Sequence, residues 1–236
     1  MGEIIRFKNI SFFNYDFKYI NKILNKKGGY LVAPAASSLV DIKKYKIYLN
    51  SLIFSDVAIF DSGFFCLLLR FYKKIKVKKL SGYLYLSLFL DQVNIKRDKL
   101  FLINPNKFEN NKNFEYLRRL GFRYSSSYVA PQYNYSNYKD KLLLKKILSY
   151  NPKYIILNLG GGIQEPLALF LSQNLKNKKK TVILCTGAAI GFLTKVQAPI
   201  SMFYDKIYLG WLVRLLFRPR NYFPRIIKSL KLINTF

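Results

Sequence analysis

Short apolar runs alternate with longer stretches of mixed apolar and polar residues from about residue 30 to residue 185. The short runs are rich in β-branched and aromatic residues and end at Pro, Gly, Ser or Asn, which is typical of buried strands. The longer stretches have the spacing of helices. The predicted strands are 30–34, 57–60, 75–80, 100–105, 154–159 and 181–185. The predicted helices are about 35–52, 63–72, 83–92, 108–120, 138–150 and 164–175.

Strands that alternate with helices of 10–15 residues indicate an α/β domain with a mostly parallel sheet flanked by helices. Residues 1–28 predict only a short strand or arm, and the Tyr-rich stretch 122–137 predicts an irregular connection. The chain has 236 residues and 51% apolar content, which is enough for one sizeable core and a small appendage. We expect the domain over residues 1–197 and the appendage over residues 198–236.

The stretch Asp56–Gly63 contains the first candidate for chemistry. Four apolar residues, 57–60, form a predicted strand that ends at Asp61-Ser62-Gly63. In a parallel α/β sheet, ligands bind at the carboxyl ends of the strands, which is where this order places Asp61. Alternatively, Asp61 caps the helix that follows.

The composition of ionisable residues narrows the choice of a catalytic base. The chain has no histidine, so a general base would be a carboxylate or, less plausibly, a Tyr, Lys or Cys with a shifted pKa. Of the 12 acidic residues, only Asp61 and Glu165 directly follow a buried-strand pattern and a turn that contains glycine.

A second candidate site is the glycine turn that follows strand 154–159. Gly160, Gly161 and Gly162 would let backbone amides approach a diphosphate at a helix N-terminus, and Gln164-Glu165 would contact the sugar or the base. A tight turn with no ligand is the alternative, and Glu165 would then only complement the helix dipole. Gly187 repeats this design after the last strand. No Walker A sequence and no dinucleotide fingerprint is present.

The net charge is extreme, with 40 Lys and Arg against 12 Asp and Glu, or +28. Nucleic acid, an anionic membrane surface or a phosphorylated substrate would exploit such a field. A compositional bias toward Lys would explain part of this charge, but not the shortage of acids. Cys66 and Cys185 lie in apolar runs, which indicates reduced core cysteines rather than a zinc site. We expect no signal peptide and no membrane span.

The C-terminal segment combines apolar residues at helical spacing with concentrated arginine. Trp211, Leu212, Leu216 and Phe217 would contact a membrane, and arginines follow closely. An amphipathic helix of this kind lies on anionic lipid, although a terminal helix that packs on the core is the alternative. These arginines are Arg214, Arg218, Arg220 and Arg225.

Several blocks in this order resemble the WecG/TagA/CpsF family, glycosyltransferase family 26, from about residue 30 to residue 227. The C-terminal block is the most specific. The blocks are Asp61-Ser62-Gly63, Lys79-Leu80-Ser81-Gly82, Gly160-Gly161-Gly162-Ile163-Gln164-Glu165, Ala198-Pro199, Gly210-Trp211-Leu212-Val213-Arg214-Leu215 and Pro219-Arg220.

The resemblance implies a Rossmann-like catalytic domain and an inverting, metal-independent transfer from a UDP-sugar to a polyprenyl-diphosphate-linked sugar. An N-acetylhexosamine such as ManNAc is one candidate for the transferred sugar. The resemblance also implies a peripheral location on the cytoplasmic face of the cell membrane, in cell-surface polysaccharide biosynthesis, with no cofactor. Other enzymes of polysaccharide synthesis would be further partners.

The resemblance also assigns roles to residues. Asp61 would be the general base on the acceptor hydroxyl. Lys79 and the glycine-turn residues, with Gln164, Glu165 and Gly187, would bind the donor, and the four arginines would stabilise the leaving diphosphate. The sequence departs from the family pattern at Ala33, Ala35, Gly191, Gln197 and Gly210, which suggests a divergent donor or acceptor.

Two other classes of function remain open at this stage. Nineteen Tyr and 20 Phe beside many basic residues would suit a module that stacks on single-stranded nucleic acid, although most of these aromatics fall in apolar runs. A scaffold without activity in a polysaccharide-synthesis complex is the other alternative.

Overall fold

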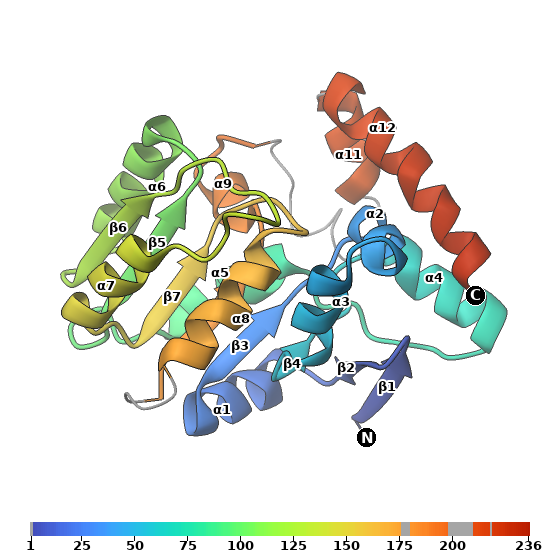
Figure 1. Ribbon diagram of the computed structural model, residues 1–236, viewed down its shortest axis with the longest axis horizontal. Coiled ribbons are helices and arrows are strands. Elements are labelled where there is room, and N and C mark those ends of the chain that lie inside the picture. The colour runs from blue at the N-terminus through green and yellow to red at the C-terminus, as the bar shows by residue number, and fades with distance from the viewer. Residues whose placement is uncertain (1, 176–179, 198–209, 218) are drawn as a thin grey trace.

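The computed structural model describes residues 2–175, 180–197, 210–217 and 219–236 (Figure 1). Within these residues, eight strands form one sheet in the order β1-β2-β4-β3-β8-β7-β5-β6. Only β1 and β2 pair in antiparallel fashion, and the other described pairs are parallel. The predicted α/β fold with a mostly parallel sheet is therefore confirmed. The strands are β1 (Glu3–Phe7), β2 (Ile10–Asn14), β3 (Gly29–Val32), β4 (Val57–Ala58), β5 (Leu100–Asn104), β6 (Ser125–Val129), β7 (Tyr154–Leu157) and β8 (Val182–Cys185).

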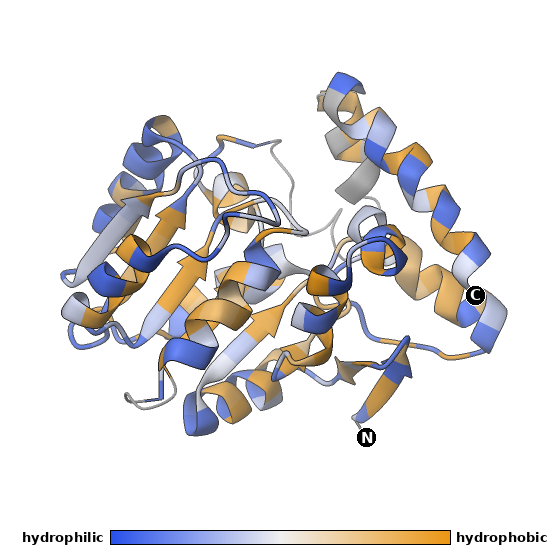
Figure 2. Ribbon diagram, viewed as in Figure 1, coloured by the Kyte–Doolittle hydropathy of each residue, from blue (hydrophilic) through white to orange (hydrophobic). Residues whose placement is uncertain are grey.

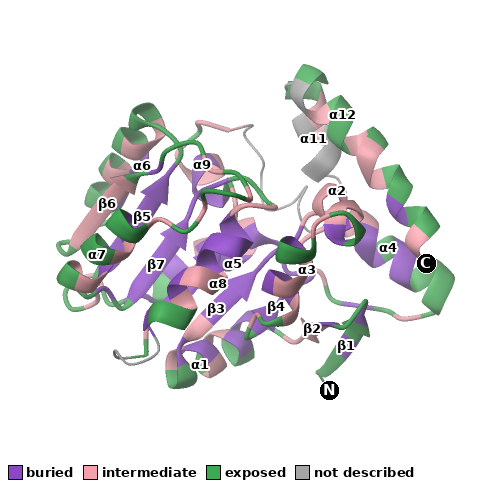
Figure 3. Ribbon diagram, viewed as in Figure 1, coloured by how far each residue is buried: buried purple, intermediate pink, exposed green. Residues whose placement is uncertain are grey.

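Helices cover both faces of the sheet (Figure 1). The central strands are fully buried because each face of the sheet packs against its own apolar cluster, and Figure 3 shows them beneath partly exposed helices. The helices are α1 (Phe17–Lys27), α2 (Ala36–Leu39), η1 (Val40–Lys43), α3 (Lys46–Ile53), α4 (Gly63–Lys73), α5 (Gly82–Gln92), α6 (Lys107–Arg119), α7 (Lys141–Tyr150), α8 (Gln164–Leu175), α9 (Ala189–Leu193), α11 (Gly210–Phe217), α12 (Pro219–Leu230) and η2 (Lys231–Thr235).

Four sequence predictions of local structure were wrong or incomplete. The helix predicted over 35–52 is divided into α2, η1 and α3. Segment 75–80 is not a strand, because β2 occupies the position beside β4. The N-terminal stretch forms a hairpin and helix α1 rather than a single strand or arm, and the irregular stretch 122–137 contains β6.

The C-terminal segment is anchored to the core. Leu232 in η2 is fully buried in the cluster that covers one face of the sheet. The ring of Phe236 lies 5.0 Å from that of Phe7 and 6.0 Å from that of Phe65, centroid to centroid. Lys228 of α12 forms an ion pair with Asp41 of η1. These contacts hold η2 and α12 against the core, and α12 also lies beside α2. The division at residue 198 stays a prediction.

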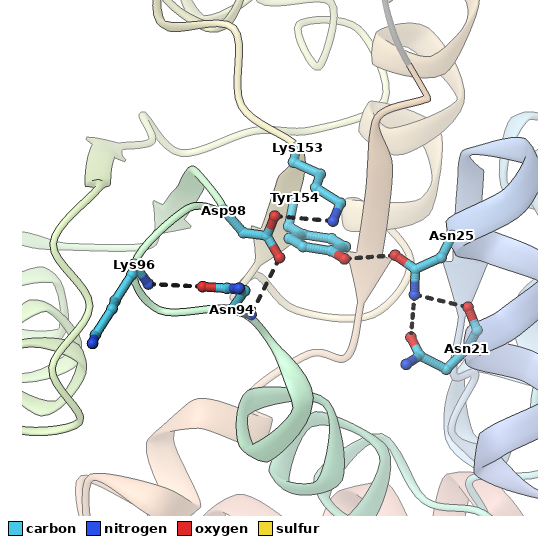
Figure 4. A network of polar contacts seen from close by, with 7 residues as sticks. All are labelled: Asn21, Asn25, Asn94, Lys96, Asp98, Lys153 and Tyr154. Atoms are coloured by element: carbon cyan, nitrogen blue, oxygen red, sulfur yellow. Dashed lines mark hydrogen bonds and ion pairs between the residues drawn. The ribbon is translucent and has the colours of Figure 1, made fainter.

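A polar network joins α1, the start of β7 and the chain that leads into β5 (Figure 4). Asp98 pairs with Lys153 at 2.9 Å and accepts a hydrogen bond from the Asn94 N–H. The Tyr154 hydroxyl donates to Asn25 on α1. Because these residues lie where β5 and β7 begin, Asp98 stabilises the end of the sheet at which the parallel strands start, opposite to their carboxyl ends.

Candidate functional site

Two neighbouring strands send their connections to opposite faces of the sheet. β3 continues into α2, whose Leu39 packs in the same cluster as Tyr30 and Cys185. β8 continues into α9, whose Ile190 packs in the cluster on the other face with Leu184. In α/β sheets, ligands bind in the crevice that such a divergence creates at the carboxyl ends of the strands. The candidate site therefore lies around the connections that follow β3 and β8.

Asp61 lies beside this crevice, just after β4. Its Oδ1 accepts a hydrogen bond of 2.8 Å from the backbone N–H of Gly82, the first residue of α5. The cap of α4 is Ser62, whose hydroxyl accepts from the Phe65 N–H at 3.3 Å. The helix that follows Asp61 is therefore capped by Ser62 and not by Asp61, so the alternative that Asp61 caps α4 is wrong.

The N-terminus of α5 fits tightly between the two diverging connections. A Cβ atom built on Gly82 would lie 3.1 Å from the carbonyl oxygen of Thr186, after β8, and 3.3 Å from the Cβ of Ala33, after β3. This close approach favours glycine. It also directs the positive end of the α5 dipole toward the crevice and toward the Asp61 carboxylate.

A cavity of about 310 Å³ lies between α4 and α12, with Asp61 in its lining. Lys79 and Arg225 supply its cationic side chains. Phe64 and Leu67 line it from α4, while Tyr222, Ile226 and Leu230 line it from α12. The cavity thus combines one carboxylate, two cations and apolar walls. The complete lining is Ala35, Ala36, Ser37, Asp61, Ser62, Gly63, Phe64, Leu67, Lys79, Tyr222, Arg225, Ile226, Ser229 and Leu230.

The glycine turn after β7, Gly160–Gly162, and Gly187 after β8 form a second group of candidate residues, the glycine cluster. Side chains of Gln164 and Glu165 hold this cluster by hydrogen bonds. The carboxylate of Glu165 accepts from the Gly162 N–H at 2.7 Å and from the Gln164 side-chain amide at 3.1 Å. The Gln164 Oε1 accepts from the Gly187 N–H at 3.1 Å. Gly162 and Gly187 both have positive φ, 97° and 62°, which glycine adopts without strain. Gln164 therefore connects the turn after β7 to the turn after β8.

Glu165 is fully buried at the first turn of α8. Burial raises the pKa of its carboxyl group to about 7, although the hydrogen bonds from Gln164 and Gly162 oppose that shift. Since it has no exposed surface, Glu165 contacts the loops that would hold a ligand rather than the solvent-filled space above them. We propose that it positions these loops.

The structure brings only some of the predicted residues together. Asp61, Lys79 and Arg225 line the same cavity, whereas Gly160–Gly162 and Gly187 belong to the glycine cluster. Lys79, predicted to bind the donor with the glycines, lies instead with Asp61. β4 and β7 are three strand steps apart in the sheet, which corresponds to about 14 Å. A ligand that reached both groups would therefore extend along the crevice past Gly82.

The remaining predictions concern α11 and α12. Arg220 is exposed on α12 and is not among the residues that line the cavity. Leu216 and Phe217 are exposed at the end of α11, at 77% and 49%. Trp211, Leu212 and Arg214 lie in α11, but their side chains are outside the described part, as is Arg218 altogether.

Sequence reasoning missed Tyr222 and Ser37 as cavity residues. Tyr222 lies one helical turn before Arg225, and the Arg225 guanidinium is 5.5 Å from the centre of its ring. That i, i+3 spacing is a signal that the sequence contains. The position of Ser37 depends on how α2 packs, and the sequence gives no comparable signal for it.

Two departures from the family pattern contact each other. Gln197 donates its backbone N–H to the Gly191 carbonyl at 2.8 Å. A Cβ on Gly191 would lie 2.7 Å from the Gln197 Cγ. The Tyr222 hydroxyl donates to the Gln197 Oε1 at 3.4 Å, which links this pair to α12. The departures at Gly191 and Gln197 are therefore spatially coupled. Ala198 and Pro199 of the family blocks lie outside the described residues.

A hollow of about 460 Å³ lies at the opposite end of β3 and β8, lined by Gly29, Asp56 and Thr181 among others. The carboxylate of Asp56 is engaged there by the Tyr30 N–H, at 2.8 Å. This acid contributes to the pairing of β3 with the start of β4. The hollow also holds two cations, Lys27 and Lys180, but it lies at the amino ends of these strands, whereas ligands of α/β sheets bind at the carboxyl ends.

The described residues give two further findings about metals and membranes. Among them, no three His, Cys, Asp or Glu side chains are grouped in a way that could hold a metal ion. No helix in the described part of the chain is long and apolar enough to cross a bilayer. Metal independence stays a prediction. Cys66 and Cys185 are buried free thiols, as expected.

The comparison with protein families gives one match over nearly the whole chain. The sequence description of the Glycosyl transferase WecG/TagA/CpsF family matches residues 5–235. The match covers the hairpin, the parallel sheet, the candidate site and the C-terminal helices. A search of curated protein sequences gives no match.

Proposed function

We propose a reaction for this chain, which belongs to the WecG/TagA/CpsF glycosyltransferase family and is therefore an enzyme of the transferase class. The proposed reaction transfers a sugar from a UDP-sugar to a polyprenyl-diphosphate-linked sugar. An N-acetylhexosamine such as ManNAc is a candidate for the transferred group. The observation that supports the proposal best is the cavity in which Asp61 lies with Lys79 and Arg225.

In this proposal Asp61 is the general base. It takes the proton of the acceptor hydroxyl while that oxygen bonds to the anomeric carbon from the face opposite to the UDP. The bond between the anomeric carbon and the diphosphate oxygen breaks in the same step, so the configuration inverts. The hydrogen bond from Gly82 fixes the Asp61 carboxylate for this role.

The leaving diphosphate gains negative charge as its bond to the sugar breaks. Lys79 and Arg225 would neutralise this charge, since charge-assisted hydrogen bonds are stronger than neutral ones. The N-terminus of α5 and the amides of the glycine turn after β7 would bind further phosphate or ribose oxygens. Arg214, Arg218 and Arg220 are proposed as additional diphosphate ligands. No metal ion is required in this arrangement.

The apolar walls of the cavity and the C-terminal helices support a lipid-linked acceptor and a peripheral position on the inner face of the cell membrane. Trp211, Leu212, Leu216 and Phe217 are proposed to contact the membrane. Bacterial cell-surface polysaccharide synthesis is the process that this acceptor implies. An inactive scaffold would retain the membrane contact and lose the response to the donor.

A thermal-shift panel of UDP and UDP-sugars, each with and without EDTA, tests the donor class. We expect UDP and one UDP-sugar to raise the melting temperature, with no effect of the chelator. No response to any uridine nucleotide would contradict the proposal. Stabilisation that disappears with EDTA would contradict its metal-independent form.

A further inference from the structure

Helix α4 has two apolar faces, and only one of them packs on the sheet. Phe65, Leu68 and Leu69 are buried in the core cluster. Leu67 and Phe71, four residues apart on another face, are 51% and 78% exposed. Positions i and i+4 lie on the same side of a helix, so these two side chains form one exposed apolar stripe.

Basic residues surround this stripe. Arg70, Lys73 and Lys74 are exposed at the C-terminal end of α4, and the Lys74 ammonium lies 5.9 Å from the centre of the Phe71 ring. No acidic residue occurs in the sequence from 62 to 90. The stripe and its surroundings therefore have the composition of an interfacial amphipathic helix, apolar in the middle and cationic at the rim.

Helix α12, which lines the same cavity as α4, has a similar exposed apolar stripe. Phe223, Ile227 and Leu230 are 57%, 47% and 50% exposed, at positions i, i+4 and i+7. The sequence from 206 to 236 contains no acidic residue either. α4 and α12 both line the cavity that contains Asp61. In Figure 1 these two helices lie at the end of the molecule opposite to α6 and α7, and Figure 2 shows apolar residues along both.

We infer that the outer face of α4 is a second membrane-contacting surface, which docks with α12 on the surface of an anionic bilayer. The inference rests on the proposed function for the peripheral location and extends it to a helix outside the C-terminal segment. The charge of the two helices favours anionic lipid over a neutral one, because the negative potential of such a surface attracts basic residues. Both walls of the cavity would then meet the bilayer, and the cavity would open toward it.

A fluorescent label on Phe71→Cys tests this contact in the full-length chain. Cys66 and Cys185 are buried, so the new thiol reacts selectively with an environment-sensitive dye. Phe108→Cys is the matched control, since Phe108 on α6 is also exposed, at 63%. With vesicles of phosphatidylcholine and phosphatidylglycerol, we expect a blue shift and a several-fold gain in emission at position 71 and no change at 108. Equal responses at the two positions would overturn the inference.

A double variant measures the strength of the contact. Leu67→Ser/Phe71→Ser is expected to bind these vesicles at least about tenfold less tightly, since removal of two apolar side chains from an interface costs more than the 1.4 kcal/mol that a factor of ten represents. Phe108→Ser/Leu142→Ser, with Leu142 57% exposed, is the control and should bind as the wild type does. Unchanged vesicle binding in a folded Leu67→Ser/Phe71→Ser protein would contradict the inference.

Two further outcomes identify the cause of a failure. A blue shift at position 71 that grows with protein concentration in the absence of lipid would show that a second copy covers α4, and would overturn the inference. Stabilisation by UDP in a protein that gives no label response with vesicles would overturn the α4 contact but leave the proposed donor chemistry standing. Absence of both responses would count against the inference and the proposed function together.

Discussion

The backbone N–H of Gly82 donates a 2.8 Å hydrogen bond to the Oδ1 of Asp61. This bond joins the first turn of α5 to the end of β4, across 21 residues of chain. It fixes one carboxylate oxygen at the positive end of a helix, where a negative charge is stabilised.

Replacement of Asp61 by Asn should lower turnover by about 10²–10⁴-fold, because the amide no longer accepts a proton. The amide oxygen can still accept from Gly82, so we expect the fold and the melting temperature to be retained. Single-turnover assays with a UDP-sugar and a lipid-linked acceptor measure the effect. Near-full activity of a folded Asp61→Asn protein would remove Asp61 from the role of base.

Gly82→Ala should destabilise the protein by about 1–3 kcal/mol, the usual cost of an extra methyl group in a packed site. The new Cβ would be 3.1 Å from a backbone oxygen that cannot move independently, the Thr186 carbonyl. Gly160→Ala is the control, because nothing lies within 4 Å of a Cβ built there. Urea unfolding of both variants tests this. Equal stabilities would show that the crevice is less tightly packed at α5 than the structure indicates.

Lys79→Met should weaken UDP binding by about tenfold or more, since a hydrogen bond to a charged group contributes about 1.5–3 kcal/mol. Lys78→Met is the control, because the neighbouring Lys78 is exposed and does not line the cavity. Calorimetric titration with UDP at constant ionic strength separates this local effect from loss of net charge. Equal losses in the two variants would contradict a specific role for Lys79.

The stability of the protein should depend on the ionisation of Glu165. The pKa of this buried carboxyl is about 7 in the folded protein and about 4.3 in an unfolded chain. The folded state therefore binds the proton more tightly, and stability falls as the pH rises from about 4.3 to about 7. The loss is about 4 kcal/mol and is complete above that range.

Glu165→Gln isolates this effect, because glutamine resembles the protonated carboxyl and has no charge to bury. The difference in unfolding free energy between the variant and the wild type should move in favour of the variant from pH 5 to pH 8. Urea denaturation at both pH values provides the measurement. A difference that stays constant with pH would show that Glu165 does not titrate in this range.

The central strands could be predicted from the sequence because they are buried on both faces and are apolar throughout. β6 was missed because it lies at the edge of the sheet, is only half-buried and begins with three serines, Ser125–Ser127. Segment 75–80 has the alternation of a strand, but β2 pairs with β4 instead. That choice depends on tertiary packing and not on local pattern.

Single residues of the candidate site could be selected from the sequence, but the contacts between them could not be predicted. Asp61 could be identified as the acid at the end of a buried strand, in a chain with no histidine. Its hydrogen bond with Gly82 joins the loop after β4 to the start of α5, and the sequence pattern within either segment does not predict that bond. The pairing of Gln164 with Gly187 is of the same kind, because the turn after β8 meets α8 only when the sheet is assembled.

The polar network around Asp98 makes the two ends of the parallel strands differ in how readily they accept substitutions. The residues that hold α1, β5 and β7 in place lie at the amino ends of these strands, so substitutions at the carboxyl ends leave those contacts intact. Ala33, Ala35, Gly191 and Gln197, the departures from the family pattern in the described residues around the crevice, all follow the carboxyl ends of β3 and β8. A change of donor or acceptor could thus be acquired by this chain without a new fold and without loss of the one it has.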